Sequence, residues 1–316
     1  MIVTLQPHVV ESNHHQALVQ MHNTATSFIL HDKTLQYQWE GRSPLSIKTF
    51  FSGRALYTLG NGYFAVDDTS YLIVNNNQSY TITIEADSPV ESFCLFFEPG
   101  FAEEVYYSLV APADHLLDDP IPLNNVAFHF FERTYRHDNL LSPKLFSLRE
   151  ELLDRRYEQT WLHEQFHELM QRLLQVHFDV YKEVETLPAL RATTREELYR
   201  RLYRAKEYAS ALFDTPITLN EMAQIASLSP NHFLRAFKHL FHQTPHQYLM
   251  SKRLERAQNL LLTTDYSVTE ISFSVGFESL GSFSWLFQHR IGCSPTAYRI
   301  QKRVEIHKRS LLFSKR

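Results

Sequence analysis

Glycine, cysteine and long apolar segments are scarce in this chain of 316 residues. The 8 glycines form no glycine-rich loop of the kind that cradles phosphate groups, which argues against nucleotide binding. The two cysteines, Cys94 and Cys293, are too few for a disulfide framework and lack metal-ligand spacing, as expected in a reducing cytoplasm. The longest apolar run has 5 residues (93–97), so we expect no membrane span, and residues 1–30 do not resemble a signal peptide.

The net charge of −4 hides a strong division along the chain. Residues 1–190 carry 12 basic and 25 acidic side chains, whereas residues 191–316 carry 19 basic and 10 acidic ones. A basic region joined to an acidic region indicates that one part of the protein meets a polyanion while the other has a separate role.

Residues 1–140 have the pattern of a β-rich domain. Segments rich in β-branched and aromatic residues alternate with Asn, Asp and Gly, which favour turns, and they cover residues 46–51, 71–74, 80–84 and 92–97. A helix is expected at residues 101–110 and a further strand at 125–136. Several short, closely spaced strands predict a sandwich or a small barrel.

Residues 141–190 have a helical pattern. Apolar residues recur there at alternating spacings of four and three, the seam of a short coiled coil: Leu162, Phe166, Leu169, Leu173, Val176 and Val180. Such a seam packs either on its own chain or on a second copy. Its position between two compact regions favours dimerisation, and Pro188 then ends the helix.

An internal repeat in the basic region carries the strongest functional signal. Residues 218–221 (TLNE) and 267–270 (SVTE) are capping boxes 49 residues apart, and each opens a short helix that ends in a tight turn. A capping serine and two core phenylalanines follow in each copy: Ser229, Phe233 and Phe237, then Ser279, Phe283 and Phe287. Two short helices joined by a tight turn, twice over, predict a double helix-turn-helix.

The solvent face of the first copy's second helix has the composition of a DNA recognition helix. Arg235 suits bidentate contact with guanine, Asn231 suits adenine, Leu234 suits a thymine methyl and Lys238 suits phosphate. His232 is a further candidate on this helix.

The second copy and the connecting helix complete the candidate DNA-binding set. The second copy offers Leu280, Ser282, Ser284 and Trp285. A connecting helix over residues 245–262, about 27 Å long, would space the two units by about one turn of DNA. This helix offers Lys252 and Arg253 as phosphate contacts.

Residues 194–300 resemble the DNA-binding domain of the AraC/XylS transcription regulators. The resemblance rests on residues 217–223 (ITLNEMA), 228–238 (LSPNHFLRAFK), 276–279 (GFES) and 294–299 (SPTAYR). It implies a seven-helix domain with two helix-turn-helix units, preceded by a sensing or dimerising domain that is similar in order to a cupin-like barrel. As partners it implies double-stranded DNA, RNA polymerase and an unidentified small-molecule effector.

Three positions depart from the family pattern. The family often has Arg at the position of Trp285, Lys at that of Gln288, and a turn glycine at that of Ser227. We therefore expect the first unit to supply most of the base readout and the second to position the protein on the backbone or read DNA shape. Trp285 either packs on DNA sugars and bases or packs against a neighbouring helix.

Two metal-based alternatives were weighed against this interpretation. His163, Glu164 and His167 form H-E-x-x-H, the motif of zinc metallopeptidases, with Glu183 or Glu185 as a possible third ligand. A single straight helix cannot wrap three ligands around one zinc ion, so this enzymatic alternative is disfavoured. Residues 40–114 contain no histidine, so we expect a metal-free barrel as well.

The sequence thus predicts an α+β multidomain protein: a β-rich, cupin-like sensor (1–140), a helical linker or dimerisation segment (141–190), an all-α double helix-turn-helix domain (191–300) and a basic tail (301–316). We expect a cytoplasmic, homodimeric transcription regulator that is not an enzyme and needs no cofactor. Activation follows from the resemblance, and the residues equally allow repression. Its effector would act by linkage, each of DNA and ligand altering the other's affinity.

Overall fold

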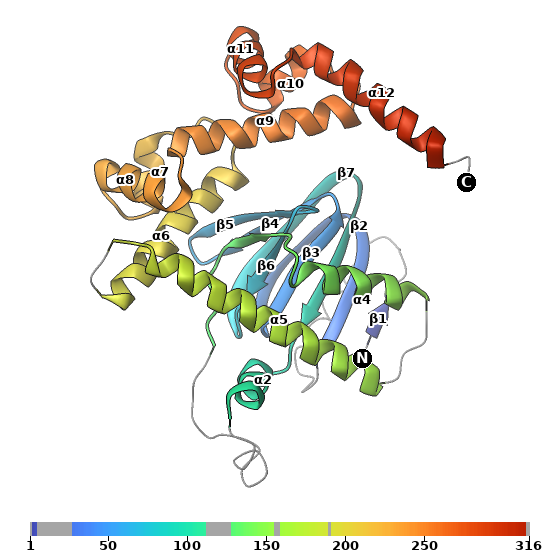
Figure 1. Ribbon diagram of the computed structural model, residues 1–316, viewed down its shortest axis with the longest axis vertical. Helices are drawn as coiled ribbons and strands as arrows, with labels where there is room; N and C mark the ends of the chain where they lie inside the picture. The colour runs from blue at the N-terminus through green and yellow to red at the C-terminus, as the bar shows by residue number, and fades with distance from the viewer. Residues whose placement is uncertain (1, 5–26, 112–127, 155–158, 189–190, 314–316) are drawn as a thin grey trace. The chain divides into compact units, whose positions relative to one another are not determined.

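The chain forms two compact units in the computed structural model, which describes residues 2–4, 27–111, 128–154, 159–188 and 191–313 (Figure 1). The units are Met1–Glu207 and Tyr208–Arg316. The division falls inside helix α6 (Ala192–Ala211), later than the predicted limit at residue 190, and the helical segment 141–190 lies in the first unit. In the described ranges, no helix is both long and apolar enough to cross a bilayer.

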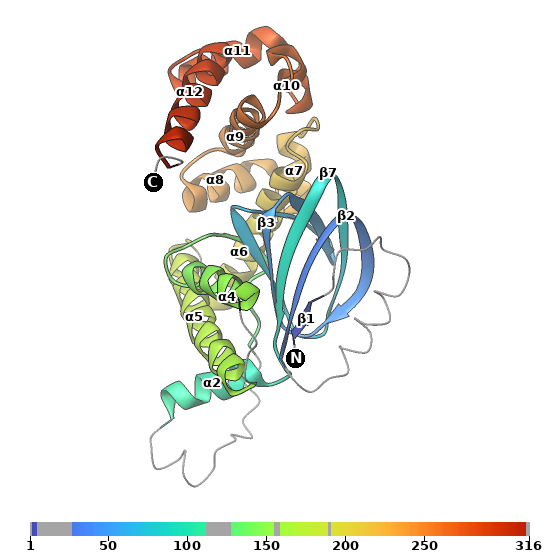
Figure 2. The same ribbon diagram turned by 90° about the vertical axis from the view of Figure 1, so that its right-hand side faces the viewer.

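The first unit is built around a curved sheet that nearly closes into a barrel (Figure 2). Its strands are β1 (Ile2–Thr4), β2 (Phe28–Ser43), β3 (Ser46–Ser52), β4 (Arg54–Leu59), β5 (Gly62–Asp67), β6 (Ser70–Val74), β7 (Gln78–Phe96) and β8 (Thr134–Arg136). They follow the order β1-β2-β7-β3-β6-β8, with β4 paired to β5 and β7. The predicted β-rich architecture is confirmed.

Strand β7 organises this sheet because it pairs with β2, β3 and β4. The two predicted strands at 80–84 and 92–97 are largely parts of this single strand of 19 residues. In the pairing with β2, Gln36 lies opposite Glu85, yet Thr34 lies opposite Val90. A bulge, and not a turn, therefore absorbs the polar residues between the two segments.

The predicted strand at 125–136 is wrong over most of its described part. Only β8 is a strand, and residues 128–133 have no regular structure. The amide of Asn75 takes the place of a strand partner, since its Nδ2 donates to Phe130 O at 3.0 Å and its Oδ1 accepts from Phe130 N at 2.8 Å. Residues 125–127 lie outside the described part of the chain.

Helices α2 (Phe101–Val110), α4 (Ser142–Asp154) and α5 (Gln159–Glu185) accompany the barrel, and α4 and α5 lie along one side of it (Figure 2). The rings of Phe97 and Phe166 are 5.5 Å apart. All six seam residues of α5 are buried against their own chain, from 0% exposed at Leu169 to 9% at Val176. The seam is thus intramolecular, which corrects the expectation that it forms a dimer contact.

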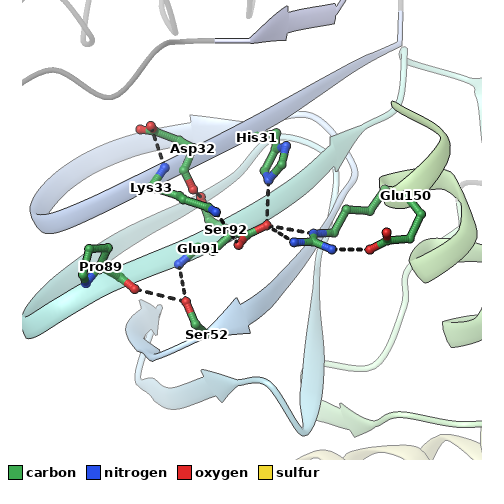
Figure 3. Close-up of polar contacts among 9 residues, drawn as sticks. His31, Asp32, Lys33, Ser52, Pro89, Glu91, Ser92 and Glu150 are labelled. Atoms are coloured by element: carbon green, nitrogen blue, oxygen red, sulfur yellow. Dashed lines mark hydrogen bonds and ion pairs between the residues drawn. The ribbon is translucent and has the colours of Figure 1, made fainter. Parts of the chain in front are cut away.

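A buried carboxylate, Glu91 on β7, ties the barrel to α4 (Figure 3). Its oxygens lie 2.9 Å from His31 Nε2 and 3.0 Å from Lys33 Nζ, and Arg149 Nε donates to it at 2.8 Å. Burial alone would raise the pKa of Glu91, but the hydrogen bonds from His31, Arg149 and Lys33 lower it to about 2. The carboxylate is therefore charged, and it is compensated by the cations of Lys33 and Arg149 and by the hydrogen bond with His31.

The second unit is helical. Beyond the end of α6 it contains α7 (Leu219–Ile225), α8 (Pro230–Phe241), α9 (Pro245–Thr263), α10 (Val268–Ser274), α11 (Leu280–Ile291) and α12 (Pro295–Phe313). Helix α9 joins the α7–α8 pair to the α10–α11 pair (Figure 1). With α6, these are seven helices in the described ranges, the number that the resemblance implies. Helix α12 extends through most of the predicted basic tail.

Candidate nucleic-acid interface

The first helix of each pair begins with the predicted capping box. Thr218 Oγ1 accepts from Glu221 N at 3.1 Å, and Glu221 Oε2 accepts from Thr218 N at 3.4 Å. The same reciprocal bonds join Ser267 and Glu270, at 3.1 and 2.7 Å. Both boxes fix where α7 and α10 start and satisfy backbone donors that would otherwise lack partners.

The turns that follow are also equivalent, but their residues differ. Ser227 has φ 53° and Gly276 has φ 86°, so both turns need the left-handed region. A Cβ at Gly276 would lie 2.7 Å from the backbone oxygen of Asp214, which excludes any side chain there without rearrangement. The strain that the sequence predicts at Ser227 is thus present in the backbone, while the second turn avoids it with glycine.

The second helices α8 and α11 bury their phenylalanines as predicted. Phe233, Phe237, Phe283 and Phe287 are all 0% exposed, which fixes the opposite faces of both helices toward solvent. The caps differ from the prediction at one position.

Ser279 caps α11 by accepting from Ser282 N at 3.2 Å. Ser229 stands at the N-cap of α8 but its side chain makes no cap hydrogen bond. Pro230 in the first turn of α8 presets the helical φ, which favours the start of the helix.

The outer face of α8 is polar and basic. Asn231, His232, Arg235 and Lys238 are exposed, and Leu234 is half-buried among them. Asn231, Arg235 and Lys238 follow one another at spacings of four and three, so they form one stripe along the helix. Within the described chain none of these three side chains has a hydrogen bond or ion pair, which leaves their donors available to a partner.

The outer face of α11 is different in kind. Leu280 is 37% exposed and Trp285 is 67% exposed, and the Trp285 ring stacks on His289 of its own helix at 5.1 Å. Ser282 is exposed and receives a hydrogen bond from the Ser279 hydroxyl, whereas Ser284 is half-buried. This surface offers an aromatic ring and hydroxyls, with Arg290 only in its last turn.

Arg253 does not belong to this surface. It is 8% exposed, and its guanidinium donates from α9 to Phe213 O at 2.8 Å and to Thr215 O at 2.9 Å. The predicted phosphate contact is therefore corrected to an internal anchor of the segment before α7. Lys252 is half-buried, and its Nζ lies 2.9 Å from Glu255 Oε2.

This arginine anchor is repeated in the second copy, which was not expected from the sequence. Fifty positions later, Arg303 of α12 donates to Thr264 O and forms an ion pair of 2.8 Å with Asp265, before α10. The helix after each pair thus clamps the segment that enters the same pair. Extending the repeat offset of 50 beyond Tyr298 would have identified Arg303.

The H-E-x-x-H motif lies on α5 without a third ligand. The rings of His163 and His167 each lie nearly perpendicular to the Phe101 ring, with ring centres 6.0 Å apart. Glu183 accepts hydrogen bonds from Arg133 at 2.9 Å and Tyr199 at 2.7 Å, so it is committed elsewhere. In the described ranges, no three metal-ligating side chains come together.

Comparisons with known proteins identify the second unit. Residues 222–301 match the family model described as a helix-turn-helix domain. The chain is 33% identical over 103 residues to the HTH-type transcriptional regulator ArgR of Pseudomonas aeruginosa, covering 33% of this chain and 31% of the relative. It is 38% identical over 118 residues to the transcriptional activator NphR of a Rhodococcus species, covering 35% and 33% of the two chains.

Among solved structures, the DNA-binding domain of AdpA in complex with a target DNA is 32% identical. That match covers 33% of this chain and 95% of that chain, with a TM-score of 0.33. The matched region spans about one third of the length of the curated relatives. Residues 222–301 of the second unit thus form a helix-turn-helix domain, as the sequence predicts, and the relatives are named as transcriptional regulators.

Proposed function

We propose that this protein is a transcription regulator that binds double-stranded DNA in a sequence-specific manner through α8 and α11. The observation that carries this proposal is the stripe of Asn231, Arg235 and Lys238. It lies on the outer face of the second helix of a capped helix-turn-helix, and its donors have no partner in the described chain. Arg235 and Asn231 suit guanine and adenine edges in the major groove, and Lys238 suits phosphate.

The two halves divide the work of binding. Helix α8 reads bases through this stripe, with His232 and Leu234 beside it. Helix α11 contacts the sugar-phosphate backbone through Leu280, Ser282, Ser284 and the ring of Trp285, and so positions the protein and reads DNA shape. Lys252 adds a phosphate contact from α9.

The β-rich region 1–140 serves as the sensor in this account. A small molecule bound inside the cupin-like barrel changes the affinity for DNA, and DNA changes the affinity for the ligand by the same factor. The protein acts in the cytoplasm as a homodimer and activates transcription by recruiting RNA polymerase. Because the α5 seam is buried in its own chain, the dimer forms through another surface.

Fluorescence anisotropy with the duplex upstream of the protein's own gene and with a scrambled duplex, over a range of salt concentrations, tests the proposal. Binding of the native duplex about 10³-fold more tightly at physiological salt is the expected result. Equal affinity for both duplexes at every salt concentration would argue against this operator. Absence of binding to either duplex, even at low salt, would contradict the DNA-binding function.

A further inference from the structure

The barrel interior contains a lysine that has no anionic partner. Lys48 lies on β3 and is 2% exposed. Its Nζ lies 3.7 Å from the centre of the Phe96 ring and 5.1 Å from that of Tyr80. In the described part of the chain, no carboxylate pairs with it and no side chain accepts a hydrogen bond from it. Burying a charge is costly, so buried ammonium groups are normally paired.

The same barrel pairs its other buried charge fully. Glu91 is 6% exposed and is compensated by His31, Lys33 and Arg149 (Figure 3). The contrast indicates that this domain does not leave buried charges unpaired in general, so the lack of an anionic partner is specific to Lys48. A buried cation that contacts only aromatic rings and lacks an anionic partner is a candidate for binding an external anion.

Lys48 also lines a cavity inside the barrel. The cavity has a volume of about 40 Å³ and is walled mostly by rings and aliphatic side chains: Tyr37, Trp39, Tyr57, Tyr80, Phe96, Leu30, Ile82 and Ile84. Polar groups are few on the rest of its wall, where Asp32, Thr34, Ser92 and Cys94 occur. Cys94 lies opposite Lys48 in the sheet, and burial raises the pKa of its thiol, so it stays neutral and cannot compensate the ammonium.

The charge state of Lys48 decides which ligand suits this site. Burial lowers the pKa of Lys48 to about 8, so the amine is still mostly protonated at pH 7. The wall is mostly apolar, and Lys48 is its one basic side chain beside the carboxylate of Asp32. This lining favours a ligand with a single negative charge, held at Lys48, and an apolar remainder. A sugar would need several polar partners, and a phosphate dianion would need more than one cation.

We propose that this cavity binds a small organic monocarboxylate, with Lys48 holding the carboxylate and the aromatic walls holding the apolar part. The inference deepens the proposed sensor function and rests on it only for its effect on DNA. A cavity of this volume has room for a few non-hydrogen atoms, so the smallest acids fit directly and larger ones require side chains to move.

Isothermal titration calorimetry of the full chain with acetate, butyrate and benzoate, each compared with its neutral amide, tests the site. At least one acid is expected to bind about 10-fold or more tightly than its amide.

Lys48→Met should remove this preference, while Lys182→Met, at a side chain 73% exposed on α5, should leave it unchanged. Lys48→Met should keep or raise the thermal midpoint, because it removes a buried charge that has no anionic partner. Lys48→Gln serves the same purpose if the methionine variant does not fold.

Three results would overturn the proposal: equal affinity for acids and amides, no binding of any acid, or full retention of binding by both Lys48 variants. DNA anisotropy on the same preparations separates this inference from the proposed function. Selective DNA binding without acid binding rejects only the ligand site. Acid binding through Lys48 that leaves DNA affinity unchanged rejects its role as effector.

Discussion

The two helix-turn-helix pairs of the second unit are alike in backbone and unlike in surface. Both pairs begin with a capping box, turn through a left-handed residue and are clamped by an arginine from the following helix. On the outside, α8 presents Asn231, Arg235 and Lys238, whereas α11 presents hydroxyls and the exposed ring of Trp285. The interactions that stabilise the fold are thus the same in both pairs, whereas the residues on the proposed DNA-binding faces differ.

In the proposed function, one fold thus supplies two modes of binding. A scaffold fixed by caps, turns and internal arginine anchors places no demand on the outer face of its second helix. Hydrogen-bond donors on that face discriminate between bases, whereas an aromatic ring adds contact area without discriminating between them.

The largest expected effect comes from substitutions at the left-handed residues of the two turns. Gly276→Ala should lower the free energy of unfolding by about 2–4 kcal/mol, because it adds left-handed strain and a Cβ contact with Asp214 O. Ser227→Gly should raise it by about 0.5–1 kcal/mol, because it removes such strain. Chemical denaturation measures both changes. If Gly276→Ala left the free energy of unfolding unchanged, the left-handed and tightly packed backbone at Gly276 would be contradicted.

Arg235→Ala should weaken operator binding by about 1–3 kcal/mol and relax the preference at one base pair. The lost contact is bidentate and specific, so binding to random DNA should change much less. Anisotropy with single-base operator variants measures this, and Arg191→Ala, an exposed arginine outside the double helix-turn-helix, is the control. An equal loss on operator and random DNA would refute base reading by Arg235.

Trp285→Ala should weaken operator and random DNA alike, by about 1–2 kcal/mol, because the ring buries apolar area against the backbone. His289→Ala removes its stacking partner and should have a smaller effect. The same titrations decide the matter. If Trp285→Ala instead reduced only the preference at one base pair, α11 would read bases, and the proposed difference between α8 and α11 would be wrong.

Lys252→Ala should have the smallest effect, about 0.5–1 kcal/mol on any duplex, with a salt slope shallower by about one ion. In the free protein Lys252 forms an ion pair with Glu255, and this pair competes with a phosphate contact. The contribution of Lys252 to the free energy of DNA binding is therefore small. Salt-dependent anisotropy measures the slope. An unchanged slope would remove Lys252 from the interface.

The sequence predicts those features that depend on neighbouring positions. The capping boxes, the phenylalanine pairs and the start of α9 at Pro245 follow from spacings of three or four residues, and all appear as predicted. The internal repeat strengthens this prediction, because finding the same spacings in both copies supports the assignment of each copy as a helix-turn-helix. The polar and basic face of α8 follows from the same periodicity once its buried face is known.

Features that depend on distant partners could not be predicted in the same way. Strand β2 is rich in polar residues and is a strand because β7 pairs with nearly all of it. Arg253 looks like a surface charge on α9 until the carbonyls of Phe213 and Thr215, about forty positions away, supply its acceptors. Lys48 alternates with Ile47 and Thr49, and only closure of the sheet places it inside the barrel.

The division of readout between the two halves is tested most directly by selecting bound duplexes from a random library, with the wild-type protein and with Arg235→Ala. We expect an enriched sequence in which one half-site has strong base preferences and the other has weak ones. The variant should lose the preference at a position in the strong half-site. Equal preferences in both half-sites, or an Arg235→Ala selection identical to that of the wild type, would contradict it.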